Sequence, residues 1–130
     1  MKDFSRLDVK CLEHWNYVEF RLIGHFTIST LTTFTSKARN IFNATGQDLK
    51  AVIFNFEFLE MIDSSAVTTI LNIHKHQAPV FICNIKGQVL DMLERLGLNK
   101  VVKIFEKREE MINASEFIRL ISPDQGPTKD

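Results

Sequence analysis

The segment Asp63-Ser64-Ser65 places one carboxylate and two hydroxyls directly before a run of residues with helical spacing. A serine at a helix start is exposed, and a phosphate on it would face free backbone N–H groups and the positive end of the helix dipole. Phosphorylation would add about −1.5 to −2 charge at that point. Asp63 would orient the hydroxyl or lie beside a partner's metal–nucleotide site. The simpler interpretation is that Asp63 or Ser64 only caps the helix.

Residues 64–76 are rich in β-branched side chains, which are poor helix formers, but their spacing favours a helix. One face is apolar apart from a histidine: Ala66, Val67, Ile70, Leu71 and His74. The other face is polar and almost uncharged: Ser65, Thr68, Thr69, Asn72 and His76. An uncharged polar face is more typical of a contact surface than of an ordinary solvated helix, so we predict that this face binds a partner.

Other groups that could perform chemistry give weaker signals. We interpret His25 either as a phosphate contact or pH-sensitive interface group near Ser64, or as a loop histidine without a role. His74 and His76 do not share a helix face, so we expect no metal site. The sequence has no Gly-x-Ser-x-Gly, which argues against a hydrolase, and we expect no catalytic residues. Cys11 and Cys83 lack a CxxC spacing and are predicted to be buried free thiols.

Strand-like and helix-like segments alternate along the chain. Residues 7–14 and 18–23 predict a hairpin that turns at 15–16, with the second strand stopping at Gly24, and further strands are expected at 51–56, 79–83 and 101–105. Helices are expected over 27–43, 64–76, 89–96 and 111–121. The N-cap of the first helix is Thr27, Ser29 or Thr30, and its end lies near Gly46. We predict an α/β domain over 1–121, with a mixed, mostly parallel sheet of four to five strands covered by about four helices, and a disordered tail over 122–130.

Composition excludes some classes of function. Sixteen basic residues balance sixteen acidic ones, so the chain lacks the basic footprint of a nucleic-acid-binding protein. Eleven phenylalanines among 130 residues indicate a bulky core or an apolar surface for a partner or ligand. We find no signal-peptide pattern and no apolar run of about 18 residues. We therefore expect a cytoplasmic protein without membrane insertion.

Three segments resemble those of one protein family. Residues 52–66, which end in Asp63-Ser64-Ser65-Ala66, resemble the signature of anti-sigma factor antagonists of the STAS family: a strand, a short loop, then Asp-Ser-Ser/Thr-Gly opening a helix. Residues 22–27 resemble the family's Gly-Glu-Leu-Asp segment, and residues 93–102 resemble its Leu-x-x-x-Gly-Leu-x-x-x-Ile/Val passage. The resemblance runs in order from about residue 7 to residue 120.

The resemblance implies a STAS-like fold and a regulatory protein without catalysis or cofactors. In that family the serine after the aspartate, here Ser64, is phosphorylated by an anti-sigma kinase and dephosphorylated by a PP2C-type phosphatase. The unphosphorylated form binds the kinase and displaces its sigma factor. We therefore expect partner contacts from residues on or near this helix, and a monomer or weak dimer. The expected contact residues are Asp63, Ser65, Thr68, Thr69, Asn72, His25 and Thr27.

The sequence departs from the family pattern at positions that leave other functions open. Ala66 replaces the usual glycine, while His25 and Thr27 replace the two acidic residues of Gly-Glu-Leu-Asp. The first alternative is an accessory STAS subunit that docks on an ABC-transporter ATPase without a phosphorylation switch. The second is binding of a small ligand or lipid in a phenylalanine-lined pocket.

Overall fold

The computed structural model describes residues 6–122 and shows a five-stranded sheet in the order β1-β2-β3-β4-β5. β1 is antiparallel to β2, and every other neighbouring pair is parallel. The strands are β1 (Leu7–Glu13), β2 (Tyr17–Phe26), β3 (Ala51–Ile62), β4 (Val80–Cys83) and β5 (Lys103–Phe105). The α/β architecture with a mixed, mostly parallel sheet is therefore confirmed.

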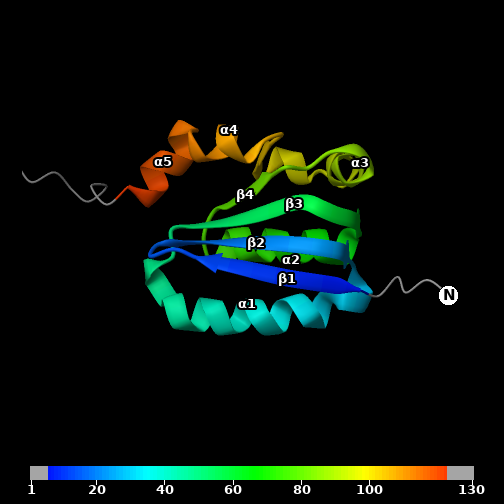
Figure 1. Cartoon of the computed structure of the whole chain (residues 1–130), viewed down its shortest axis with the longest axis horizontal. Helices are drawn as coiled ribbons and strands as arrows, with labels where there is room; N and C mark the ends of the chain where they lie inside the picture. The colour runs from blue at the N-terminus through cyan, green and yellow to red at the C-terminus, as the bar shows by residue number, and fades with distance from the viewer. Residues whose placement is uncertain (1–5, 123–130) are drawn as a thin grey trace, which may run out of the picture.

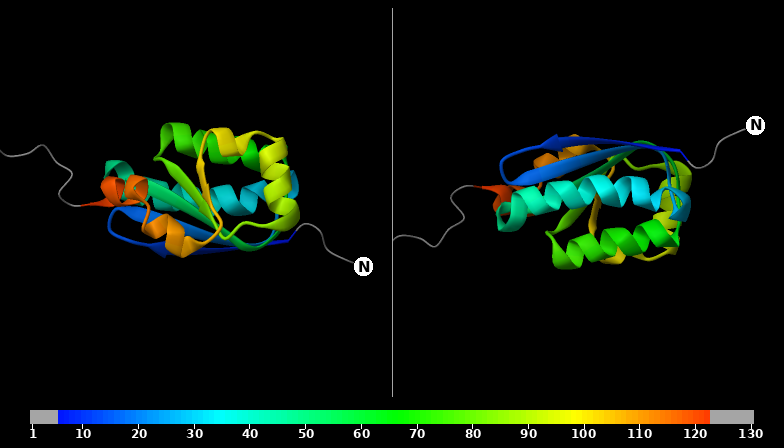
Figure 2. Two further views of the ribbon diagram at one scale, coloured as in Figure 1. Left: turned by 90° about the horizontal axis from the view of Figure 1, so that it is seen from above. Right: turned by 90° about the horizontal axis from the view of Figure 1, so that it is seen from below.

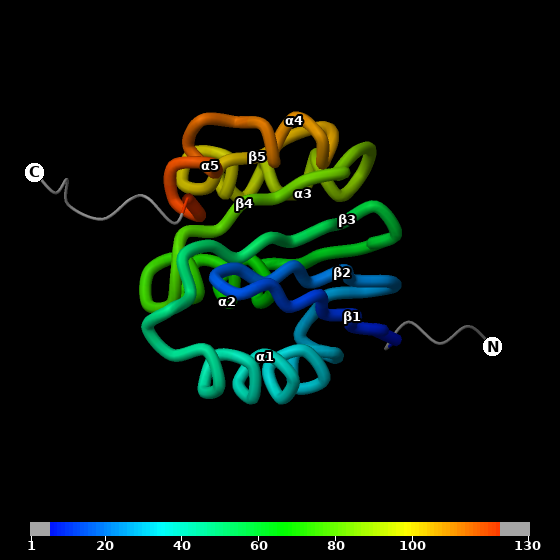
Figure 3. The backbone as a smooth tube through the Cα atoms, turned by 60° about the vertical axis from the view of Figure 1, so that its left-hand side comes forward, coloured from blue at the N-terminus to red at the C-terminus, as the bar shows by residue number. Residues whose placement is uncertain are grey.

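Helices cover both faces of the sheet (Figure 1). The α-helices are α1 (Leu31–Thr45), α2 (Ser64–His76), α3 (Gly87–Arg95), α4 (Arg108–Ile112) and α5 (Ser115–Ile121). Short 3-10 turns are η1 (Ile28–Thr30), η2 (Gly46–Asp48) and η3 (Leu98–Lys100). α1, α2 and α3 enclose the larger apolar core, and α4 and α5 cover a smaller one on the opposite face. In Figure 3, α1 lies on one side of the strands, and α4 and α5 lie on the other.

Phenylalanine rings fill the larger core, which is the main reason for their number in this chain. Phe20, Phe26, Phe34 and Phe54 are fully buried, and the centroids of neighbouring rings lie 5.0 to 6.4 Å apart. These rings come from β2, α1 and β3, so they join α1 to the centre of the sheet. No helix within residues 6–122 is long and apolar enough to cross a bilayer.

β3 is longer than the sequence predicted. The strand begins at Ala51 but continues past Phe56 to Ile62, so no short loop separates it from α2. Its register against β2 shifts twice: one extra β3 residue lies between the pairs Arg21–Asn55 and Ile23–Phe58, and a second before His25–Met61. These irregularities break the alternation of buried and exposed residues, which hides the end of the strand from a pattern search.

β2 also extends beyond its predicted end. Gly24 lies inside the strand with φ of 111°, and a Cβ there would approach the Arg6 carbonyl oxygen to 2.5 Å. The glycine is therefore needed for a close approach of two backbones, and the next residue, His25, donates its N–H to the same Arg6 oxygen at 2.8 Å. β2 consequently ends at Phe26, beside the end of β3.

The last predicted helix is two helices. α4 ends at Ile112, and Ala114 is extended (φ −73°, ψ 138°) before α5 begins at Ser115. The Asn113 side chain donates to the Glu109 carbonyl at 2.9 Å and ends α4. The break turns Phe117 of α5 onto Phe81 of the sheet, with ring centroids 5.4 Å apart. Residues 123–130 of the predicted tail lie outside the described residues.

Candidate functional site: the N-terminal end of helix α2

Asp63 is the N-cap of α2. Its backbone is extended (φ −128°, ψ −177°), its Oδ1 accepts the Ala66 N–H at 3.1 Å, and its carbonyl accepts the Val67 N–H at 3.1 Å. The choice that the sequence left open between Asp63 and Ser64 is thereby decided in favour of Asp63. A carboxylate here also interacts favourably with the positive end of the helix dipole.

The second carboxylate oxygen of Asp63 joins α2 to the end of β2. Oδ2 accepts the Ile28 N–H at 2.9 Å, and the Asp63 N–H donates to the Phe26 carbonyl at 3.3 Å. Both carboxylate oxygens thus have backbone partners. The role of Asp63 seen in the structure is to hold the β2–η1 turn against the start of α2.

Two threonines shape the same turn. The Thr30 hydroxyl accepts the Thr27 N–H at 3.1 Å and donates to the His25 carbonyl at 2.7 Å. Thr27 precedes the 3-10 turn and Thr30 is the N-cap of α1, so Ser29 is excluded as the cap. Thr27 is 8% exposed, which leaves its side chain little surface for a partner.

Ser64 is the first residue of α2 and is exposed. Within residues 6–122, its hydroxyl makes no hydrogen bond, and the N–H groups of Ser64 and Ser65 have no acceptor. A free hydroxyl beside free N–H groups at the positive end of a helix is a suitable acceptor for a phosphoryl group.

The rest of α2 presents the polar face that the spacing predicted. Thr68 and Asn72 are exposed, whereas Ser65 and Thr69 are half-buried and the Thr69 hydroxyl donates to the Ser65 carbonyl at 3.0 Å. The opposite face is buried in the larger core through Ala66, Val67, Ile70 and Ile73.

Two exposed apolar residues next to this helix end were not expected from the sequence. Ile28 is 65% exposed, and it is the residue whose N–H bonds to Asp63. Met61, two residues before Asp63 on β3, is 47% exposed. Sequence patterns suggest burial for such residue types, so only their place at the ends of the elements identifies them as surface.

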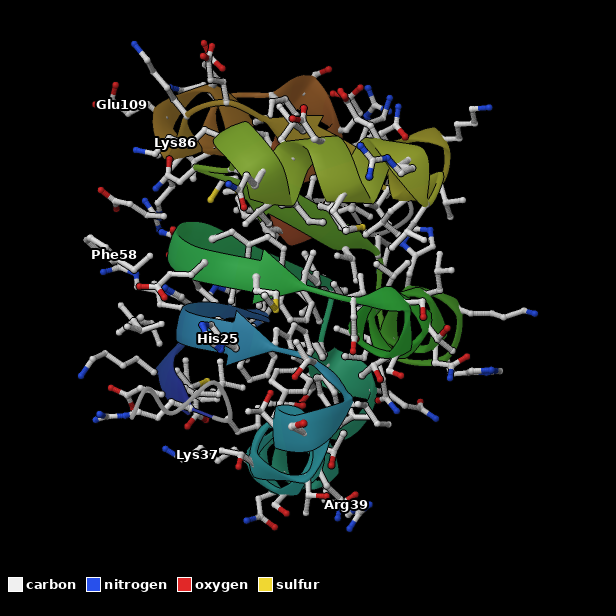
Figure 4. The ribbon with its side chains drawn as sticks, turned by 90° about the vertical axis from the view of Figure 1, so that its right-hand side faces the viewer. His25, Lys37, Arg39, Phe58, Lys86 and Glu109 are labelled. Carbon is white, nitrogen blue, oxygen red and sulfur yellow. The ribbon has the colours of Figure 1, made fainter. Side chains whose placement is uncertain are left out.

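His25 is not a loop residue. It lies in β2, opposite Met61 of β3, and its side chain is almost buried. Its Nε2 lies 3.3 Å from Oε1 of Glu60, on β3. Figure 4 shows His25 on the strand beside the one that carries the exposed Phe58. The histidine therefore has a carboxylate neighbour in the sheet.

The histidines of α2 have separate surroundings. His74 accepts the Val80 N–H on its Nδ1 at 3.0 Å, which joins the end of α2 to the start of β4, and His76 is exposed. Among residues 6–122, no three His, Cys, Asp or Glu side chains gather as metal ligands.

Comparison with known proteins identifies the family. A model of the STAS domain family matches residues 8–111, which is most of the chain. The chain belongs to the STAS domain family. No curated protein matches the sequence.

Solved structures share the STAS fold at low sequence identity. An anti-sigma factor antagonist from Mycobacterium paratuberculosis is similar with a TM-score of 0.72 at 9% identity, covering 86% of this chain and 96% of the other. The anti-sigma factor antagonist SpoIIAA in its unphosphorylated form gives 0.60 at 17% identity, covering 82% and 93%. The Bacillus cell fate determinant SpoIIAA in the phosphorylated form gives 0.56 at 20% identity, covering 82% and 96%.

This STAS domain also contains a buried polar cluster that sequence patterns did not reveal. Glu19 of β2 is fully buried; its Oε1 accepts from Arg108 Nε at 2.9 Å and Nη2 at 2.8 Å, and its Oε2 accepts from Arg21 Nε at 2.9 Å and Asn55 Nδ2 at 3.1 Å. Asn84 completes the cluster by accepting the Arg108 N–H at 2.9 Å. Burial raises the pKa of the Glu19 carboxyl, but the hydrogen bonds from Arg108, Arg21 and Asn55 outweigh it, so the pKa lies below its usual range.

The cluster attaches the α4–α5 unit of the STAS domain to the sheet. Arg108 is the first residue of α4, 89 residues after Glu19 in the chain. A buried carboxylate of this kind is stable only with several donors in place. The cluster lies on the α4–α5 face of the sheet, so we assign it to the support of the fold.

Proposed function

We propose that this STAS domain is an anti-sigma factor antagonist, a regulatory module without catalysis of its own, whose partner surface is the N-terminal end of α2 and whose switch is phosphorylation of Ser64. The observation that carries the proposal is the exposed Ser64 hydroxyl, which has no hydrogen bond within residues 6–122 and lies at the first position of a helix that Asp63 holds against β2. The similarity to SpoIIAA, whose structure exists in unphosphorylated and phosphorylated forms, supports it.

The surface around Ser64 suits a switched interface. Exposed Ile28 and Met61 supply apolar contact area, while Ser65, Thr68 and Asn72 supply hydrogen-bonding groups without charge. A partner that buries this surface would have to desolvate a phosphate on Ser64, with about −1.5 to −2 charge. The phosphate would weaken binding by bulk, by desolvation and by repulsion from acidic partner groups. No unfolding of the domain is required.

The partners in this proposal are a serine kinase of the anti-sigma type and a PP2C-type phosphatase. The unphosphorylated domain binds the kinase, and the phosphatase restores that form. In this arrangement Asp63 and Thr27 act indirectly, because Asp63 uses both carboxylate oxygens within the domain and Thr27 is buried. Thr69 and His25 shape the edges of the surface rather than its centre.

A second candidate is docking on an ABC-transporter ATPase without a phosphorylation switch. It is favoured by the uncharged polar face of α2 and by Thr27, which stands where the family pattern has a carboxylate. Such a surface can bind a partner constitutively through shape and hydrogen bonds.

Affinity capture with a matched control separates the two candidates. The bait proteins are wild type, Ser64→Asp and Ser115→Asp, because Ser115 is also an exposed first residue of a helix but belongs to α5. We expect wild type and Ser115→Asp to recover an ATP-binding serine kinase and Ser64→Asp to lose it. Intact-mass analysis of the native protein should then show a species heavier by about 80 Da, one phosphate. Recovery of an ABC ATPase by all three baits, with no such species, would overturn the switch in favour of docking.

A further inference from the structure

A groove of about 480 Å³ lies between α1 and α2 on the outer side of the larger core. The two helices run side by side there, as the right-hand view of Figure 2 shows. Its floor consists of buried Phe34, Ala38 and Ile73, and half-buried Phe42 forms part of one wall. The volume falls within the range of roughly 300–1,000 Å³ that is usual for small-molecule sites.

The rim of this α1–α2 groove is polar and has no acidic side chain. Arg39 and Asn43 come from α1, and Asn72, His76 and Gln77 come from α2 and its end. All five are exposed. Within residues 6–122 none of their side chains has a hydrogen-bond or ion-pair partner, so their donors are free to bind a ligand.

The charge on these two helices is entirely basic. α1 and α2 contain Lys37, Arg39 and Lys75 but not one Asp or Glu, although the whole chain has sixteen of each sign. The Lys37 ammonium donates to the Val9 carbonyl at 3.0 Å and so belongs to the β1 side of α1. Figure 4 shows Lys37 and Arg39 leaving α1 in different directions, and Arg39 is the one of the two that lines the groove. Arg39 is thus the fixed charge of the groove.

We propose that the α1–α2 groove binds a small amphiphile with a single anionic head and a short aliphatic tail, such as a medium-chain carboxylate. The tail lies on the floor formed by Phe34, Ala38 and Ile73. The head binds the Arg39 guanidinium, whose planar fork of donors matches a carboxylate, with help from the rim amides.

Other occupants fit the groove less well. A polyanion would leave the apolar floor unused, and a cation would meet Arg39 with no carboxylate to receive it. A bilayer surface is also a poor match, because the large hydrophobic residues that are strongly exposed between 6 and 122 all lie outside α1 and α2. Ser64 does not line the groove, although the groove shares Thr69 and Asn72 with the polar face of α2. Asn72 is eight residues beyond Ser64 on α2, about 12 Å at 1.5 Å per residue.

Calorimetric titration of the full chain with defined probes tests the proposal. The probes are hexanoate, octanoate and decanoate below their micelle-forming concentrations, with decyltrimethylammonium as a cation of equal tail length. We expect saturable 1:1 binding of decanoate that strengthens about two- to fourfold for each added methylene, and at least tenfold weaker binding of the cation. Equal affinity for the cation, or no saturation by decanoate at millimolar concentration, would overturn the proposal.

Two charge-reversal variants locate the site. Arg39→Glu should weaken decanoate binding at least tenfold, whereas Lys75→Glu, with the same change in net charge on an exposed α2 residue outside the groove, should change it less than twofold at 0.15 M salt. Thermal unfolding checks that both variants fold. Amide chemical-shift changes on adding decanoate to wild type should cluster on α1 and α2, so the site remains testable even if a variant misfolds. Shift changes elsewhere, or binding to anionic vesicles without binding to decanoate, would contradict the proposal.

Discussion

The Asp63 carboxylate accepts the backbone N–H of Ile28 at 2.9 Å, across 35 residues of chain, while its other oxygen caps α2 through Ala66. One side chain thus fixes the start of α2 relative to the end of β2. Exposed Ile28 and exposed Ser64 are held in one surface by this contact. The geometry of the proposed switch therefore depends on a residue whose two carboxylate oxygens each accept a backbone N–H within the domain.

Replacing Asp63 with alanine should lower the free energy of unfolding by about 2 kcal/mol, because it removes an N-cap and a charged hydrogen-bond acceptor together. Asp63→Asn should lower the free energy of unfolding by less, since its single amide oxygen can still accept one of the two N–H groups. Urea denaturation measures both. Asp91→Ala, which removes an exposed carboxylate of α3, is the control and should stay within about 0.5 kcal/mol of wild type. An Asp63→Ala loss as small as that of the control would show that the contact with Ile28 is dispensable.

Ser64→Asp should leave the domain as stable as wild type or raise its stability by about 0.3–1 kcal/mol, because a negative charge in the first turn interacts favourably with the helix dipole. Thermal unfolding at low salt tests this directly. Gln77→Asp places the same charge at the C-cap of α2 and is expected to shift the midpoint in the opposite direction. A large loss of stability in Ser64→Asp would mean that any loss of partner binding comes from unfolding rather than from a changed surface.

Glu19→Gln should destabilise the domain by about 3–5 kcal/mol, because it leaves Arg108 partly buried without its counter-charge. The pKa of Glu19 is lower in the folded than in the unfolded state, so its charge stabilises the fold above the unfolded pKa. That contribution is lost as the pH falls through the folded pKa, which lies below the usual value for a glutamate. Urea denaturation at several pH values should show the difference between wild type and Glu19→Gln shrinking in acid.

Glu116→Gln is the control for this measurement, because Glu116 pairs with Lys103 on the surface, 3.5 Å away. It should leave the unfolding midpoint almost unchanged, since exposed ion pairs contribute little. A pH-independent difference between wild type and Glu19→Gln would contradict the role of the Glu19 charge.

Both cysteines should react slowly with iodoacetamide at pH 8 in the folded protein. Burial, with a smaller effect of Glu13, raises the pKa of Cys11 to about 11, and burial together with Glu19 raises that of Cys83 to about 12. The thiolate is the reactive form, so little of it is present at this pH. Intact-mass analysis should show Cys11, which is half-buried, labelled before fully buried Cys83. Both should react readily in urea, and rapid native labelling of Cys83 would show that β4 opens.

Local sequence patterns were sufficient to predict much of the fold. The spacing of Ala66, Val67 and Ile70 predicted α2 despite its β-branched residues, and the apolar run at 51–56 predicted a central strand. Gly46 and Gly97 mark the ends of helical segments, and both have positive φ. These features depend on neighbours within a few residues, so the sequence shows them directly. The irregular second half of β3 and the break between α4 and α5 depend on contacts with other elements, and they escaped prediction.

The sequence by itself determined that this is an α/β domain of the STAS type with a serine at the start of a helix. Only the tertiary structure decided how that serine is presented. The contact that decides it joins Asp63 to Ile28 across 35 residues, and a second long-range contact, between Glu19 and Arg108 across 89 residues, attaches α4 to the sheet. Ile28 and Met61 are surface residues for the same reason, since exposure depends on which elements meet at the end of the sheet. Hydrogen bonds and burial between distant segments leave no periodic signal along the chain, so they become visible only when the elements are assembled.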